Sequence, residues 1–143
     1  MSGIDSLFSG MRISSTGLAA ERFRMDVISE NIANSRTTAT PDGGPYRRKL
    51  VSFAPLLRDS LRDAGISLGV EEPEVVEDFS NEFVRVLEPG HPDADSEGMV
   101  RYPNVNAAVE MADMVTSMRA YEANLSAQET FVRMAERALE LLR

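Results

Sequence analysis

The chain of 143 residues has no cysteine, no tryptophan and a single histidine, His91. The missing cysteine excludes a disulfide framework, a thiolate metal site and a cysteine nucleophile. One histidine excludes a metal site built from several histidines. The length is that of about one domain.

Long apolar runs are also missing. No stretch approaches the ~18 consecutive apolar residues of a membrane span, so we expect no direct insertion into a membrane. Residues 1–13 lack a basic segment followed by an apolar run, which predicts that no signal peptide is cleaved.

Positive charge is scarce, with 15 Lys and Arg against 23 Asp and Glu and a net charge of -8. This balance argues against nucleic acid as a partner. Ten of the acidic residues fall in 71–97, where Arg85 is the only Lys or Arg. We interpret this stretch as a solvated strand edge, where charge discourages unwanted pairing.

Proline is absent from both ends of the chain, because all seven prolines lie between residues 41 and 103. An interior proline costs a helix ~3 kcal/mol, so the ends can form long helices and the middle cannot. The sequence therefore predicts a mainly α protein with a small β part (α+β). Its predicted parts are an N-terminal helix in 1–40, a β-rich domain rich in proline and glycine in 41–103, and a C-terminal helix in 104–143.

Both ends carry apolar residues at alternating spacings of three and four, which is typical of a coiled coil. The alternative is an amphipathic helix in a compact bundle. We expect the two stripes to cover each other and to contact neighbouring chains during assembly. The N-terminal stripe consists of Leu7, Met11, Leu18, Met25, Ile28 and Ile32, and the C-terminal stripe of Met111, Met114, Met118, Tyr121, Leu125, Val132, Leu139 and Leu142.

Four short segments of the middle are rich in β-branched and aromatic residues and are bounded by glycine or proline. They predict strands of one small sheet, at 46–53, 65–70, 73–78 and 82–87.

The turn at 88–98 places His91 near Asp93 and Asp95. A metal-dependent hydrolase could use such a group, but the spacing does not match a Ca²⁺ loop. We favour a structural turn whose aspartates cap their own backbone. The sequence has no phosphate-binding glycine motif and no nucleophile elbow, so we expect no cofactor, no metal site and no enzymatic activity.

Two stretches, residues 24–49 and 88–124, carry the most specific pattern of the chain. The residues that form this pattern are Asn31, Asn34, Tyr46, Arg47, Arg48, Gly90, His91, Pro92, Asp93, Asp95, Tyr102, Pro103, Asn104, Asn106, Tyr121 and Asn124. The two stretches closely resemble the flagellar axial proteins, the family of rod and hook subunits, and above all its proximal rod members.

This resemblance implies a structural subunit of the bacterial flagellar basal-body rod, in which the terminal helices form a coiled coil. The subunit would assemble helically around the export channel and help to transmit motor torque to the hook and filament. Its partners would be further copies of itself, other proximal and distal rod subunits, and the flagellar type III export apparatus. It would reach the periplasmic rod without a cleaved signal peptide. The alternatives are another proximal rod protein and a cytosolic coiled-coil adaptor.

Three asparagines are expected at helix ends. Asn34 suits a helix C-terminus, since asparagine tolerates the left-handed conformation. Asn104 or Asn106 suits the N-cap of the C-terminal helix, and Glu110 lies early enough in that helix to favour the positive end of its dipole.

Overall fold

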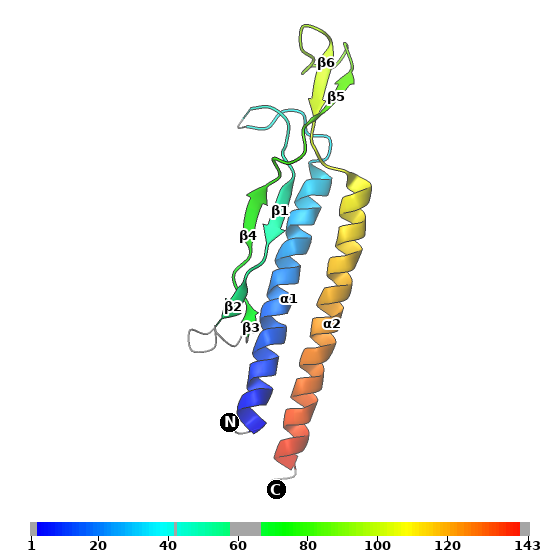
Figure 1. The fold of residues 1–143 in the computed structure, drawn as a ribbon. Coiled ribbons are helices and arrows are strands. Elements are labelled where there is room, and N and C mark those ends of the chain that lie inside the picture. The colour runs from blue at the N-terminus through cyan, green and yellow to red at the C-terminus, as the bar shows by residue number, and fades with distance from the viewer. Residues whose placement is uncertain (1–2, 42, 58–66, 141–143) are drawn as a thin grey trace. The chain divides into compact units, whose positions relative to one another are not determined.

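The computed structural model describes residues 3–41, 43–57 and 67–140 (Figure 1). Helices α1 (Gly3–Ala33) and α2 (Ala107–Glu140) lie at the two ends of the chain. The strands between them are β1 (Lys49–Ser52), β2 (Pro55–Leu57), β3 (Ser67–Val70), β4 (Glu74–Glu77), β5 (Val84–Leu87) and β6 (Met99–Tyr102). Two helices with small strand pairs agree with the predicted α+β class. No helix in the described ranges is long and apolar enough to cross a membrane.

The strands form three separate two-stranded pairs, β1 with β4, β2 with β3 and β5 with β6. The pairs β2–β3 and β5–β6 are antiparallel. The prediction of one small sheet is therefore wrong, although β1, β3, β4 and β5 fall inside the four predicted segments. Two strands were not predicted, namely β2, which begins with a proline, and β6, which leads directly towards α2.

Two compact units share the helices and strands. The first contains residues up to 25, 52–74 and residues from 116, and the second contains 26–51 and 75–115. Each unit thus holds part of α1 and part of α2. The boundaries 1–40, 41–103 and 104–143 describe the predicted functional parts and stay a prediction.

In the first unit, α1 presents glycines to larger side chains of α2. A Cβ atom at Gly10 would lie 2.6 Å from the Phe131 ring, and one at Gly17 would lie 3.0 Å from the Asn124 amide. The two contacts are seven residues apart on each helix and run in opposite directions, so the helix segments pack antiparallel here. Ser117, a further seven residues back from Asn124, is fully buried.

The expectation that the two apolar stripes cover each other is wrong for α2. Its contacts with α1 come from the series that includes Asn124 and Phe131, whereas most of the predicted stripe is exposed. On α1, Ile28 is buried, and Met11, Leu18, Met25 and Ile32 are half-buried. On α2, Met114 and Tyr121 are half-buried, while Met111, Met118, Leu125, Val132 and Leu139 are exposed. The side chain of Leu7 and the whole of Leu142 lie outside the described residues.

The second unit contains the end of α1, the start of α2, most of the β1–β4 pair and the β5–β6 hairpin. Its buried residues include Val100, Tyr46, Asn31, Asp78 and Glu110. A unit of this size with so many buried polar side chains requires a hydrogen-bond partner for each of them.

Candidate functional site

Asn31, on the last turns of α1, is 1% exposed and uses its whole side-chain amide. Its Nδ2 group donates to the Lys49 carbonyl at 2.8 Å and to Glu110 Oε2 at 3.0 Å. Its Oδ1 accepts from the Lys49 N–H and the Tyr46 hydroxyl, both at 2.9 Å. An asparagine amide has two donors and two acceptor sites, so all four are satisfied. Asn31 thereby joins α1, β1 and α2.

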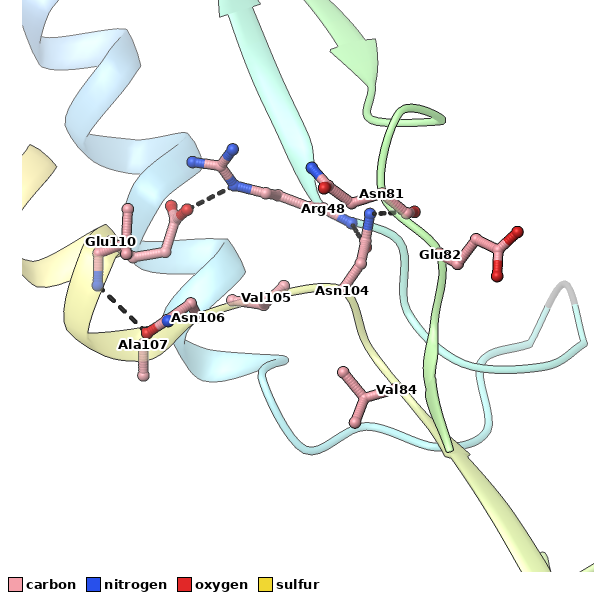
Figure 2. A pocket seen from close by; sticks show the side chains of 10 residues that line it. Arg48, Asn81, Glu82, Val84, Asn104, Val105, Asn106, Ala107 and Glu110 are labelled. Carbon is pink, nitrogen blue, oxygen red and sulfur yellow. Dashed lines mark hydrogen bonds and ion pairs between the residues drawn. The ribbon is translucent and has the colours of Figure 1, made fainter. Parts of the chain in front are cut away.

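Glu110, in the first turn of α2, is also 1% exposed. Its second oxygen, Oε1, accepts from Arg48 Nε at 2.6 Å (Figure 2). The other guanidinium nitrogens of Arg48 lie 3.8 Å from Asp78 and 3.6 Å from Asp113. One cation therefore faces three carboxylates.

Asn104 holds the main chain of Arg48 in place. The Arg48 N–H donates to Asn104 Oδ1 at 2.8 Å, and the Asn104 amide donates to the carbonyls of Asp78 and Asn81 at 3.0 and 3.2 Å. The Arg48 carbonyl accepts from the Asp78 N–H at 2.8 Å. We call the network of Asn31, Tyr46, Arg48, Asp78, Asn104 and Glu110 the polar junction.

The environment shifts the pKa values of two members of the polar junction. Hydrogen bonds from the Asn81 side chain and nearby N–H groups, together with Arg48, hold the pKa of Asp78 below 3.8 against the effect of burial. Asp78 therefore stabilises the fold above the unfolded pKa of ~3.9, and that contribution is lost as the pH falls through the lower folded pKa. Burial, with help from Glu30 and Glu110, raises the pKa of Tyr46 far above 10.0. Tyr46 thus remains a hydrogen-bond donor.

An open depression of about 590 Å³ adjoins the polar junction (Figure 2). Arg48, Asn104, Asn106 and Glu110 line it together with Val84 and Val109. No serine, threonine, cysteine or histidine lines it, so the depression offers no common nucleophile and no imidazole base. Among the described residues no group of three His, Asp or Glu side chains is arranged to hold a metal ion.

In the turn at 88–98, the carboxylates of Asp93 and Asp95 have different hydrogen-bond partners. Asp95 Oδ1 accepts from the N–H groups of Glu97 and Met99, both at 2.9 Å, and the Met99 bond is the main cause of its lowered pKa. Asp93 Oδ2 accepts from the Thr38 hydroxyl at 2.6 Å, and its N–H donates to His91 Nδ1 at 3.1 Å. The prediction that aspartates cap this turn is confirmed for Asp95.

Gly98 is the conformationally demanding glycine of this turn. Its φ is +74°, and an added Cβ would lie 3.1 Å from Pro89, whereas Gly90 has open space around it. We expect Gly98→Ala to lower the free energy of unfolding by about 1–2 kcal/mol, since a left-handed L-residue is strained. Gly90→Ala, the matched control, should change it by less than about 0.5 kcal/mol. Urea unfolding of both variants measures the difference, and equal effects would contradict this account.

The expectations for helix ends are resolved by specific hydrogen bonds. Asn106 is the N-cap of α2, since its Oδ1 accepts from the N–H groups of Ala108 and Val109 at 3.1 and 3.4 Å. Asn104 instead belongs to the polar junction. Asn34 follows the end of α1 and its amide donates to the Glu30 carbonyl, but no described non-glycine residue has a positive φ. The prediction that Asn34 lies at a helix C-terminus is confirmed, but the left-handed conformation given as its reason is not adopted.

The other residues that carry the family resemblance lie outside the polar junction. Arg47 stacks on Phe79 and Phe83, and the Tyr102 hydroxyl donates to Glu88 at 2.9 Å. Pro103 is buried and Pro92 is exposed. The sequence does not predict the role of Asp78 in the polar junction, because the acidic stretch that contains it is typical of a solvated strand edge. Ser80 and Asn81, which follow Asp78 and donate to its carboxylate at 2.9 Å, are the local signal of a turn at this position.

Comparison with known protein sequences identifies the family of this chain. The model "Flagella basal body rod protein" matches residues 11–38, and the model "Flagellar basal body rod FlgEFG protein C-terminal" matches residues 96–141. The chain is 42% identical to the flagellar basal-body rod protein FlgC of Borreliella burgdorferi, over 95% of this chain and 97% of that protein. The chain belongs to the FlgC family of flagellar basal-body rod proteins. The resemblance seen in the sequence is confirmed.

Other FlgC proteins match over similar lengths. The Bacillus subtilis protein is 39% identical over 94% of this chain and 97% of its own length. The Salmonella typhimurium protein is 35% identical over 90% of this chain and 92% of its own length. The ranges matched by the two rod models contain Asn31, Asn104 and Glu110, so the polar junction joins the two parts of the chain that the rod models describe.

Proposed function

We propose that the chain is a structural subunit of the bacterial flagellar basal-body rod, as the names of its FlgC relatives indicate. The polar junction fits a structural role, because its side chains are occupied by bonds within the chain. Asn31 has all four amide positions filled, and Glu110 has both oxygens filled. Such a network fixes backbone positions and leaves little chemistry free for a substrate.

The observation that carries this proposal is the exposed part of the C-terminal stripe. Five large apolar side chains of α2 recur at intervals of seven residues and are 39–67% exposed. Exposed apolar residues in such a row are typical of a protein interface, and the interval is that of a coiled coil. They are Met111, Met118, Leu125, Val132 and Leu139.

In the function we propose, this row packs against helices of neighbouring subunits. The terminal helices form a coiled coil, and the subunits assemble helically in the proximal rod around the export channel, where they help to transmit torque. The partners are further copies and other rod subunits. The chain reaches the periplasm through the type III export apparatus without cleavage of a signal peptide. It acts without catalysis, metal or cofactor.

The stripe is tested by placing the same charge on two faces of α2. Leu125→Asp should abolish incorporation into basal bodies and swimming, since an unpaired buried charge costs several kcal/mol. Ala123→Asp, at an exposed position two residues away and on a different face, should leave both close to normal. Immunoblots of purified basal bodies and swimming assays measure the result.

Two outcomes would overturn this proposal. Normal incorporation of the Leu125→Asp variant would exclude the stripe as the assembly surface. A wild-type chain that is absent from basal bodies and forms a discrete dimer in the cytosol would instead identify a coiled-coil adaptor, the second candidate.

A further inference from the structure

The second unit carries an unusual cluster of cations and aromatic rings beside the β5–β6 hairpin. We call the group Arg47, Phe79, Phe83, Arg85 and Arg101 the arginine–phenylalanine patch. These residues, with Asn81 and Glu82, line a depression of about 270 Å³. The Arg47 guanidinium lies 4.5 Å from the centre of the Phe79 ring and 4.3 Å from that of Phe83. Phe79 is nevertheless 73% exposed.

The hairpin places two positive charges directly opposite each other. Arg85 pairs with Arg101 in the antiparallel register, so both side chains project from the same face (Figure 1 shows β5 and β6). Like charges in this position destabilise a strand pair. Arg85 has a distant ion pair with Asp95 at 3.5 Å, and Arg101 has no ion pair with any described residue. Among the described residues, the three arginines of the patch therefore have a single ion pair, that of Arg85 with Asp95, although Glu82 also lines the depression.

Arginine and aromatic side chains are the residues enriched at the centres of protein interfaces. An anionic partner would relieve the repulsion between Arg85 and Arg101 and cover the exposed ring of Phe79. A chain with a net charge of -8 is itself such a partner.

Strand β4 has the complementary chemistry. Its sequence is Glu-Val-Val-Glu, and all four residues are exposed, Val75 at 40% and Val76 at 45%. Glu71 and Glu72 precede it and are exposed too. Within the described ranges β4 pairs with β1 alone, and an unpaired strand edge is a site where another chain can dock.

We propose that β4 of one copy docks on the arginine–phenylalanine patch of the next copy. The carboxylate of Glu74 meets Arg85 and Arg101, and Val76, which lies on the same face of β4 as Glu74, covers Phe79. Since the two surfaces differ, the contact is head-to-tail and repeats from copy to copy instead of closing a symmetric dimer. It is a second assembly contact, distinct from the α2 stripe, and its place in the rod rests on the proposed function.

Charge reversal tests the contact in the purified full-length chain. Arg101→Glu and Glu74→Lys should each weaken self-association at least about tenfold, because like charges across an interface cost several kcal/mol. The double variant should recover to within about threefold of the wild type, since the acidic side chain introduced on one copy then faces the basic side chain introduced on the next. Sedimentation velocity at about 0.01 M and 1 M salt, where the Debye length is ~30 and ~3 Å, should show weaker association at high salt.

The variants separate this contact from a folding defect. Arg101→Glu places opposite charges across the hairpin, so its unfolding midpoint should equal or exceed that of the wild type. Arg36→Glu and Glu97→Lys are the matched controls at exposed positions outside the patch and β4, and they should leave association unchanged. Loss of association in these controls would assign the effect to net charge and overturn the contact.

The remaining outcomes are equally decisive. Docking of β4 on the patch would be overturned if neither charge reversal weakened self-association, or if the double variant associated as weakly as the single variants. If only a charge change in a different basal-body protein corrects the Arg101→Glu defect, the partner of the patch is that protein, and docking of a second copy is overturned. Incorporation of the wild-type chain into basal bodies is scored separately, so a failed contact leaves the proposed function intact and a failed incorporation refutes that function directly.

Discussion

Replacing Asn31 with alanine is expected to lower the free energy of unfolding by about 3–5 kcal/mol, which is near the upper end for single substitutions. The change removes four hydrogen bonds from a side chain that is 1% exposed. It leaves the Tyr46 hydroxyl, both main-chain groups of Lys49 and one oxygen of Glu110 without that partner. Each buried polar group left unpaired costs about 1–3 kcal/mol, and relaxation or water entry reduces the sum.

Two controls show whether the effect belongs to the polar junction. Asn34→Ala removes an amide only three residues away, which donates to the Glu30 carbonyl and accepts from Thr37, and it should cost about 1 kcal/mol or less. Asn31→Asp keeps the acceptor oxygen but loses both donors and faces the Glu110 carboxylate, so it should be no better than alanine.

Urea unfolding and amide exchange measure the change. The Lys49 amide, which donates to Asn31 Oδ1, should lose protection in Asn31→Ala and keep it in Asn34→Ala. Equal stability and equal protection in the two variants would show that Asn31 does not hold the polar junction together.

The helices were predictable because the controlling signals are local. Proline cannot occupy a helix interior, and both proline-free ends contain α-helices, α1 at Gly3–Ala33 and α2 at Ala107–Glu140. The contacting face was not predictable in the same way. Periodicity marks where apolar residues recur, but α1 offers Gly10 and Gly17 to Phe131 and Asn124. A glycine carries no hydrophobic signal, so counting apolar positions misses the face with which it packs.

The polar junction was predictable only in part, for a different reason. Asn31, Tyr46, Arg48 and Asn104 were marked by the family resemblance, but their partners lie far away in sequence. Asn31 and Glu110 are separated by 79 residues, and Arg48 and Glu110 by 62. Asp78 is one of ten acidic residues in the stretch 71–97, and the other nine are all more exposed. Ser80 and Asn81, which follow Asp78 and donate to its carboxylate, are a local signal for a turn. The burial of that carboxylate is not predicted by this signal, since it depends on the tertiary position of Arg48.

Replacing Arg48 with methionine should be about as harmful as Asn31→Ala, at about 3–5 kcal/mol, because removal of one partner leaves buried charge uncompensated. Methionine retains much of the length and apolar surface of the arginine stem. What it removes is the cation that lies 2.6 Å from Glu110 and within 4 Å of Asp78 and Asp113. Glu110 and Asp78 are 1% and 3% exposed, so water can solvate neither carboxylate well.

The reverse deletion should be milder. Glu110→Met leaves Arg48 with Asp78 and Asp113, so the cation keeps anionic neighbours and is itself partly exposed. The double variant Arg48→Met with Glu110→Met should be more stable than Arg48→Met alone, since apolar residues in place of a buried ion pair are often tolerated. The double-mutant cycle, measured by urea unfolding at neutral pH, gives the coupling energy between the two side chains. Additive effects of the two substitutions, or a Glu110→Met variant less stable than Arg48→Met, would show that Arg48 is not the common counterion of the polar junction.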